Sequence, residues 1–333
     1  MKANKWIGVD IHKKQITVCI LRGKEKENKV YERTLEGIQE FLKEVDNETI
    51  IGVESTTWTR DFAIKCLDKA KDVIIFNTIE LSKIMSKVKK TDKIDAGCIA
   101  LILKRFDKEE LSKCMIKSKE YAEIKGLLKI RESLVEKKRR TKNEIISMLD
   151  YWGCYREERF RFNEKDKKWI ETQKDLPESI KKEILNLIEL IEIYENQIKE
   201  IEMELNKLLE KDKKYKKLLE IKGIGRITGA YVVSKIENIN RFTNSKKLVS
   251  YFGLAPRVSI SDGKGCNGRI TKNTDKDLLR VLVQSAWIMI RYNREMLMFY
   301  NRLKSRTCKQ KAIIAVARKI VIMIFYVLKQ AEA

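Results

Sequence analysis

Trp6-Ile-Gly-Val-Asp10 and Ile50-Ile-Gly-Val-Glu54 are two apolar runs that each end in a carboxylate. The second run, read from Thr49, is continuously apolar, which favours a strand buried at the centre of a sheet. The first run is followed by a polar turn at Lys13 and Lys14 and then by a β-rich stretch at 15–21, so a hairpin is expected.

Helices and strands alternate after this hairpin. Residues 29–33 predict a third antiparallel strand, and 72–76 predict a further strand. Helical spacing follows in 38–45, 61–70 and from 81 onward. Three strands followed by alternating helices and strands is the order of an α/β fold like that of ribonuclease H.

Acidic residues are the main candidates for chemistry in this region. In such a sheet the first and fourth strands are neighbours, so the carboxylates that end them are expected in one site. Lys90-Thr-Asp-Lys-Ile-Asp-Ala96 adds two more acids, spaced by three and therefore on one helical face. The predicted tetrad is Asp10, Glu54, Asp92 and Asp95.

Four converging carboxylates repel one another unless a divalent cation neutralises them. Oxygen ligands favour Mg²⁺ or Mn²⁺ over zinc, and such ions serve phosphoryl transfer. The alternative for each acid is an ordinary strand-end or helix-capping role. His12, two residues after Asp10, is expected to be a hairpin residue without a catalytic role.

The middle of the chain, 107–215, carries almost no strand pattern. A long basic helix is predicted at 122–148, and residues 152–176 are polar and irregular. From Leu187 to Leu208 apolar residues alternate in steps of four and three, a heptad seam that pairs either with the earlier helix or with another subunit. The basic helix contains a cluster of five cations: Lys137, Lys138, Arg139, Arg140 and Lys142.

Two glycine-rich stretches mark the last third of the chain. Ile221-Lys-Gly-Ile-Gly225 resembles a helix-hairpin-helix turn, in which Gly223 and Gly225 let backbone N–H groups approach a phosphate. A tight turn between helices is the alternative. Residues 253–272 form a Gly/Ser loop, and helices are predicted at 276–286 and 309–329.

That loop has the parts for attack on a phosphodiester: a serine among cations that would stabilise a transferring phosphoryl group. A phosphate-contacting or flexible surface loop is the simpler interpretation. The flanking cations are Arg257, Lys264, Arg269 and Lys272.

Composition agrees with a polyanionic partner. The 333 residues include 71 Lys and Arg against 48 Asp and Glu, a net charge of +23. A lysine-rich coding bias is the rival explanation. The 43% hydrophobic content is enough for folded cores and excludes a disordered basic tail.

Several protein classes are excluded by missing motifs. Seven cysteines without CxxC pairing, with a single histidine, exclude zinc fingers and indicate reduced thiols in a cytoplasmic protein. GxGxxG and GxxxxGK[ST] cofactor motifs are absent. The start of the chain does not read as a signal peptide, and the apolar run 320–328 is too short for a membrane span.

Taken together, these motifs resemble the DEDD transposases of the insertion-sequence-110 family, relatives of the Piv DNA invertase. The resemblance covers nearly the whole chain. It is carried by Gly8-Val-Asp-Ile-His-Lys13, Val53-Glu-Ser-Thr56, the Lys90–Ala96 string, the Gly-Ile-Gly turn and the stretch from Tyr251 to Lys272.

The resemblance implies three parts: a RuvC-like nuclease domain at 1–108, a helical coiled-coil linker at 109–215, and a mostly helical transposase domain at 216–333. It assigns the metal-binding tetrad to the four acids and the family's serine nucleophile to Ser261. Asp262 replaces the glycine that usually follows this serine, and Ser259 is a second candidate. Thr57 is a milder departure after Glu54.

The resemblance further implies DNA recombination on donor and target DNA, with Mg²⁺ and a structured noncoding bridge RNA. A homo-oligomer, dimer or tetramer, is expected, in a bacterial, nucleoid-associated, cytoplasmic setting without a membrane. Two other classes stay open: a structure-selective nuclease of the Holliday-junction type that uses the tetrad alone, and a non-catalytic DNA-binding descendant.

Overall fold

The computed structural model describes residues 5–84, 91–106, 113–261, 264–270 and 275–332. Its contacts divide the chain into two compact units, 1–116 and 117–333. The predicted linker and C-terminal part therefore share one unit, while the three-part division by function stays a prediction.

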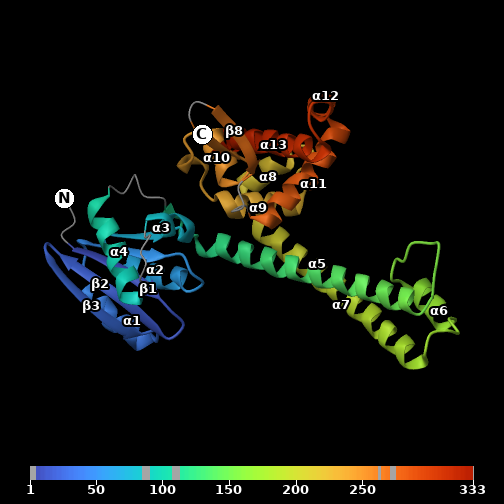
Figure 1. Cartoon of the computed structure of the whole chain (residues 1–333), viewed down its shortest axis with the longest axis horizontal. Helices are drawn as coiled ribbons and strands as arrows, with labels where there is room; N and C mark the ends of the chain where they lie inside the picture. The colour runs from blue at the N-terminus through green and yellow to red at the C-terminus, as the bar shows by residue number, and fades with distance from the viewer. Residues whose placement is uncertain (1–4, 85–90, 107–112, 262–263, 271–274, 333) are drawn as a thin grey trace. The chain divides into compact units, whose positions relative to one another are not determined.

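A six-stranded mixed sheet forms the first unit, in the order β3-β2-β1-β4-β5-β6. Its first three strands are labelled in Figure 1. The predicted hairpin is confirmed: β1 and β2 pair antiparallel, and β3 continues the meander. Parallel pairing joins β1 to β4 and β4 to β5, whereas β6 is antiparallel to β5. The strands are β1 (Lys5–Ile11), β2 (Gln15–Arg22), β3 (Glu25–Glu32), β4 (Thr49–Glu54), β5 (Asp72–Phe76) and β6 (Lys113–Cys114).

Side chains alternate between the two faces of this sheet. On one face, Ile7, Val9, Ile51 and Val53 pack in a core with apolar residues of α1 and α2. On the other face α4 packs against the strands. The helical elements are α1 (Leu35–Phe41), η1 (Leu42–Glu44), α2 (Thr59–Leu67), α3 (Thr78–Ile84) and α4 (Asp92–Arg105).

The second unit begins with a long helical hairpin, drawn in green in Figure 1. Helices α5 (Lys119–Tyr151) and α7 (Glu178–Leu209) run antiparallel, joined by ion pairs such as Arg131 to Glu202 at 2.7 Å. The short α6 (Glu164–Glu171) lies at the tip. Of the heptad seam, Ile191, Ile198 and Leu205 are buried, so the seam has a packing partner within the chain.

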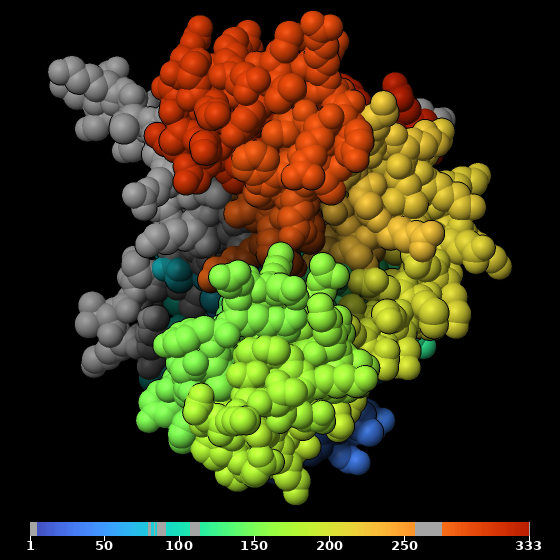
Figure 2. Space-filling view, turned by 90° about the vertical axis from the view of Figure 1, so that its right-hand side faces the viewer, coloured from blue at the N-terminus to red at the C-terminus, as the bar shows by residue number. Residues whose placement is uncertain are grey.

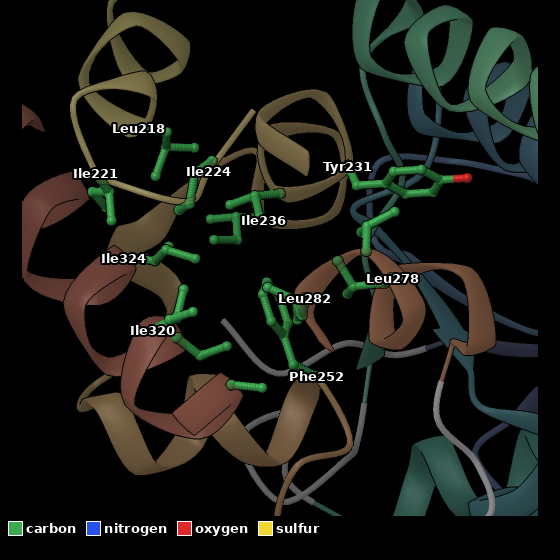
Figure 3. Close-up of a cluster of buried hydrophobic side chains, with 14 of the residues drawn as sticks. Leu218, Ile221, Ile224, Tyr231, Ile236, Phe252, Leu278, Leu282, Ile320 and Ile324 are labelled. Carbon is green, nitrogen blue, oxygen red and sulfur yellow. The ribbon is translucent and has the colours of Figure 1, made fainter. Parts of the chain in front are cut away.

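The remaining helices enclose the largest apolar core (Figure 3). Ile221 and Ile224 of the glycine turn pack there with Leu282, Ile320 and Ile324, and each such buried side chain contributes about 2 kcal/mol to stability. These elements are α8 (Lys213–Leu219), α9 (Arg226–Ile236), η2 (Ile239–Arg241), α10 (Ser245–Tyr251), α11 (Lys276–Tyr292), α12 (Arg294–Lys304) and α13 (Lys309–Glu332).

The apolar run 320–328 lies inside α13 with five buried side chains, as expected of a core helix. No helix in the described part of the chain combines the length and apolarity needed to cross a membrane. The six cysteines whose side chains are described are free thiols.

The elements that were not predicted include β6, α6, α10, α12 and the hairpin of β7 (Pro256–Ser261) with β8 (Lys264–Ile270). The Gly/Ser stretch that reads as a loop is thus two paired strands for most of its length. Strand β3 also begins four residues earlier than its apolar pattern, because its first four residues are exposed and polar.

Candidate active site and nucleic-acid-binding surfaces

Two glycines let α4 approach the sheet at the centre of the candidate site. Gly8 and Gly52 lie side by side in the parallel register of β1 and β4. A Cβ on Gly8 would lie 2.0 Å from the carbonyl oxygen of Ala96, and a Cβ on Gly52 would meet the side chain of Ile99 at 2.8 Å. Both glycines therefore face α4.

Asp10 and Glu54 follow these glycines by two residues, so they belong to the same face of the sheet. The register Gly8 to Gly52 and Val9 to Val53 continues toward Asp10 and Glu54 at matching positions. The sequence thus brings two carboxylates to the strand ends under the start of α4.

Helix α4 adds its own acids in its first turn, Asp92 and Asp95. Thr91 caps the helix by accepting a hydrogen bond from the Ile94 N–H at 3.3 Å. Carboxylates are favourable at a helix N-terminus, so the ordinary capping-turn role also applies to both. Asp92 is anchored further by the Gln15 side-chain amide, which donates to its Oδ2 at 3.1 Å.

His12 joins the acids directly. Its Nε2 lies 3.2 Å from Oδ2 of Asp10 and 3.3 Å from Oδ1 of Asp92. His12 lies in the turn between β1 and β2, as expected of a hairpin residue, and its ring contacts two of the predicted acids. The signal that could have found it is the strand alternation, because residues 10 and 12 share one face.

The electrostatics of this cluster follow from burial and charge. Burial raises the pKa of the Asp10 carboxyl; His12 opposes this, and the charges of Asp92 and Asp95 add to it. Partial burial lowers the pKa of His12, but Asp10 and Asp92 outweigh it, so the net shift is upward from 6.5. When the imidazole is protonated, it neutralises part of the acidic cluster.

The side chains of this cluster can bind a metal cation as well as the proton of His12. Among the described residues, one ligand atom each of Asp10, His12 and Asp92 lie within 4.8 Å of one another. Two carboxylates and an imidazole match the ligands of Mn²⁺ and related ions, and the carboxylates alone match Mg²⁺. The charge of Asp95 acts on Asp10, whereas Glu54 and Asp95 are not members of this group of three ligand atoms.

Ser261 belongs to the second unit, where it ends β7 and pairs with Lys264 of β8. Arg257, Ser259 and Arg269 lie in the same hairpin, of which the structure describes the backbone. Asp262 and Lys272 lie outside the described residues.

The glycine turn joins α8 to α9 as a helix–turn–helix element. Gly223 has a φ of +92°, and a Cβ there would lie 2.8 Å from the carbonyl oxygen of Ser285 in α11. That position serves packing, as a tight interhelical turn requires. Gly225 caps α9 and has open space around it, which leaves room for a phosphate.

The predicted basic cluster lies on α5 of the hairpin. Lys138 and Lys142 both contact Glu195 of α7, at 3.5 and 3.4 Å. Arg139 and Arg140 are exposed and pair with Glu136 on their own helix. Surface pairs of this kind are worth little, so these arginines and the exposed Lys137 are available to phosphates.

Comparison with known protein families matches both units. A model described as "Transposase", of the DEDD type found in IS110 elements, matches residues 7–152. A second, described as "Transposase IS116/IS110/IS902 family", matches residues 215–301. The first match spans the acidic cluster and the basic helix, and the second begins just before the glycine turn and continues past the β7–β8 hairpin.

Individual relatives are transposases too. The chain is 39% identical over 90 residues to the transposase for insertion sequence element IS1328 of Yersinia enterocolitica, 27% of each chain. It is 23% identical over 207 residues to a probable family 20 transposase of Pseudomonas aeruginosa, 61% of each. It is 24% identical over 259 residues to the transposase for IS1111A of Coxiella burnetii, covering 74% of this chain and 68% of that one.

The aligned stretches cover 27% and 61% of the first two relatives' own lengths. The motifs that carry the likeness occur in the same order along the chain as the two family models, with the acids first and the glycine turn and serine hairpin second. The chain belongs to the IS110 family of transposases.

Proposed function

We propose that this chain is a DNA recombinase that excises and inserts a mobile element, with a divalent cation at the acidic cluster and a serine nucleophile. The observation that carries the proposal is the meeting of Asp10, His12 and Asp92 within 4.8 Å, where β1 ends under α4. The strand order supports a RuvC-like assignment of the first unit.

In this proposal Asp10, Glu54, Asp92 and Asp95 hold Mg²⁺ or Mn²⁺. The cation supplies Lewis-acid polarisation of a phosphodiester when it is bound. His12, which contacts two of the acids, would orient them, and a bound cation would take over the neutralisation that the protonated imidazole otherwise provides.

Ser261 supplies the nucleophile. Its oxygen forms a bond to phosphorus while the strand's phosphorus–oxygen bond breaks, which leaves a serine–DNA ester and a free hydroxyl end. Arg257, Lys264 and Arg269 of the same hairpin would stabilise the charge on the phosphoryl oxygens. Ser259 is the alternative nucleophile on the same strand.

The proposed partners are donor DNA, target DNA and a bridge RNA encoded beside the gene. The proposed active form of the protein is a dimer or tetramer. The α8–turn–α9 element, as a helix-hairpin-helix, would bind phosphates without reading sequence. The test is an incubation of the protein with the folded RNA from the flanking region, DNA carrying the element ends, and Mg²⁺.

Asp10→Asn and Ser261→Ala should each abolish recombination, with nucleic-acid binding in EDTA unchanged. Asp61→Asn, an exposed carboxylate on α2, and Ser250→Ala, an exposed serine on α10, are the matched controls. A covalent serine–DNA adduct supports the proposal. Cleavage without an adduct indicates a junction nuclease, and binding without cleavage indicates a non-catalytic descendant. Normal recombination by either variant contradicts a site that needs both the acidic cluster and Ser261.

A further inference from the structure

A hollow of about 1000 Å³ lies at the tip of the α5–α7 hairpin, the end that faces the viewer in Figure 2. It is lined by α5, by the segment 156–163 and by the start of α6. Six cations line it, and no other described pocket gathers as many: Arg139, Lys142, Arg156, Arg159, Arg161 and Lys165.

The floor of this tip hollow is built around one buried acid. Asp166 accepts hydrogen bonds from the backbone N–H groups of Arg161 at 2.8 Å and Phe162 at 2.6 Å, and from the Arg156 side chain at 2.6 Å. Phe162 is held at a φ of +63°, in the left-handed region. These bonds fix the segment in one conformation, so its other side chains are presented from a rigid support.

Two exposed arginines on this support form no ion pair within the described part of the chain. Arg159 and Arg161 are exposed, and neither forms an ion pair with any residue in the described part of the chain. The other cations of the hollow are at least partly neutralised: Arg156 by Asp166 and Lys142 by Glu195. A ligand that enters therefore meets a net positive wall.

An aromatic surface lies between these two arginines in sequence. Phe160 is half-buried; its ring packs edge-on against Trp169, with centroids 5.3 Å apart, and the Arg156 guanidinium lies 5.5 Å from its centroid. Ile146, 40% exposed, adds an apolar patch on α5. Flat apolar groups beside free cations match a base attached to its phosphates.

We propose that the tip hollow binds an unpaired nucleic-acid strand, with Arg159 and Arg161 on consecutive phosphates and Phe160 against a base. A duplex would use the arginines alone, because its bases are stacked inward and do not reach the aromatic floor. The proposal does not depend on catalysis, since binding is measured in EDTA, where the acidic cluster holds no metal.

The test is fluorescence anisotropy of the full chain with labelled oligonucleotides of one length: single-stranded RNA, single-stranded DNA, duplex, and an abasic strand. The test variant is Arg159→Gln/Arg161→Gln. The control variant is Lys182→Gln/Lys207→Gln, which removes the same charge from exposed positions of α7 outside the hollow.

We expect the arginine variant to bind the single strand at least tenfold more weakly than the control variant. Its log–log salt slope should be shallower by about 1.4, because each phosphate contact on a single strand accounts for about 0.7. The abasic strand should bind wild type more weakly than the intact strand. The RNA and DNA arms decide which strand the hollow prefers.

A 5-iodouracil-labelled strand, irradiated on the wild-type protein, should cross-link to the segment 155–165 or to Trp169. Thermal melting of both variants establishes that they fold alike; a variant that melts early is replaced by Arg159→Lys/Arg161→Lys, which keeps the charge and should restore binding. Equal affinity of the arginine and control variants, or cross-links confined to other segments, would overturn the proposal.

Discussion

His12 is the only histidine of the chain, so its titration can be observed without interference. In EDTA its pKa should lie above 6.5, because the two acids outweigh its partial burial. The proton is then bound more tightly in the folded state, so its contribution to stability is complete below pH 6.5 and is lost as pH rises through the raised pKa.

Nuclear magnetic resonance of the imidazole measures this value directly. In Asp10→Asn the pKa of His12 should fall, because one of its two carboxylate partners is gone. Asp61→Asn should leave it unchanged. A wild-type value at or below 6.5 would contradict the hydrogen-bonded cluster.

Asp10 should cost the protein stability when no metal is present. Burial raises its pKa, so at pH 8 the folded state carries a carboxylate in surroundings that favour the neutral form. Asp10→Asn should therefore raise the free energy of unfolding by about 1 kcal/mol in EDTA. Millimolar Mn²⁺ should raise the melting temperature of the wild type and not of the variant; an equal rise in both would place the metal elsewhere.

At the scale of elements, the close contact of α4 with β1 is the feature most open to test. Gly8→Ala puts a methyl carbon 2.0 Å from the Ala96 carbonyl oxygen and 2.4 Å from the Ala100 nitrogen, so the helix must move. We expect a loss of about 3 kcal/mol in urea unfolding and weaker metal binding. Gly126→Ala, in open space within α5, should instead stabilise by about 1 kcal/mol.

The segment before α6 depends on one carboxylate. Burial raises the pKa of Asp166, but the Arg161 N–H, Arg156 and further backbone donors outweigh it, and the net shift is downward. Its stabilisation is therefore present at neutral pH and lost as pH falls below about 4. Asp166→Ala should cost about 3 kcal/mol and speed hydrogen exchange at residues 161–163, whereas the exposed Asp150→Ala should not.

How far the sequence predicts each element depends on burial. Strands β4 and β5 were predicted to the residue, because their apolar runs end where burial ends. The start of β3 was missed because its exposed edge residues show no alternation. The β7–β8 hairpin was taken for a loop, since glycine and serine lack the β-branched and aromatic enrichment that predicts strands.

The candidate site divides in the same way. The two similar apolar runs predicted that the strands ending in Asp10 and Glu54 are neighbours, and the parallel pairing of β1 with β4 confirms this, while the meeting of the two carboxylates stays a prediction. His12 lies one residue beyond the end of β1 and reaches the acids through its side chain. The tip hollow depends on the buried Asp166, which holds the preceding turn through hydrogen bonds to its backbone. The alternation of β1, continued by one residue, puts His12 on the face of Asp10, whereas the buried Asp166 has no periodic pattern in the sequence.

For the whole molecule, the charge of +23 should govern affinity for nucleic acid. With six or more phosphate contacts, non-specific affinity should fall roughly a thousandfold between 50 and 200 mM salt through counterion release. Titrations of a random-sequence duplex across that range measure the slope. A flat response would favour coding bias as the origin of the lysines.

The paired glycines Gly8 and Gly52 under α4 also determine which substitutions the protein can tolerate as its sequence evolves. Helix and sheet touch through backbone atoms at Gly8. This contact therefore fixes the distance between the strand acids and the helix acids. Substitutions elsewhere on α4 can change the stability of the packing between helix and sheet, but not the distance between the two pairs of acids. Drift in this region should accumulate around the two glycines and spare them.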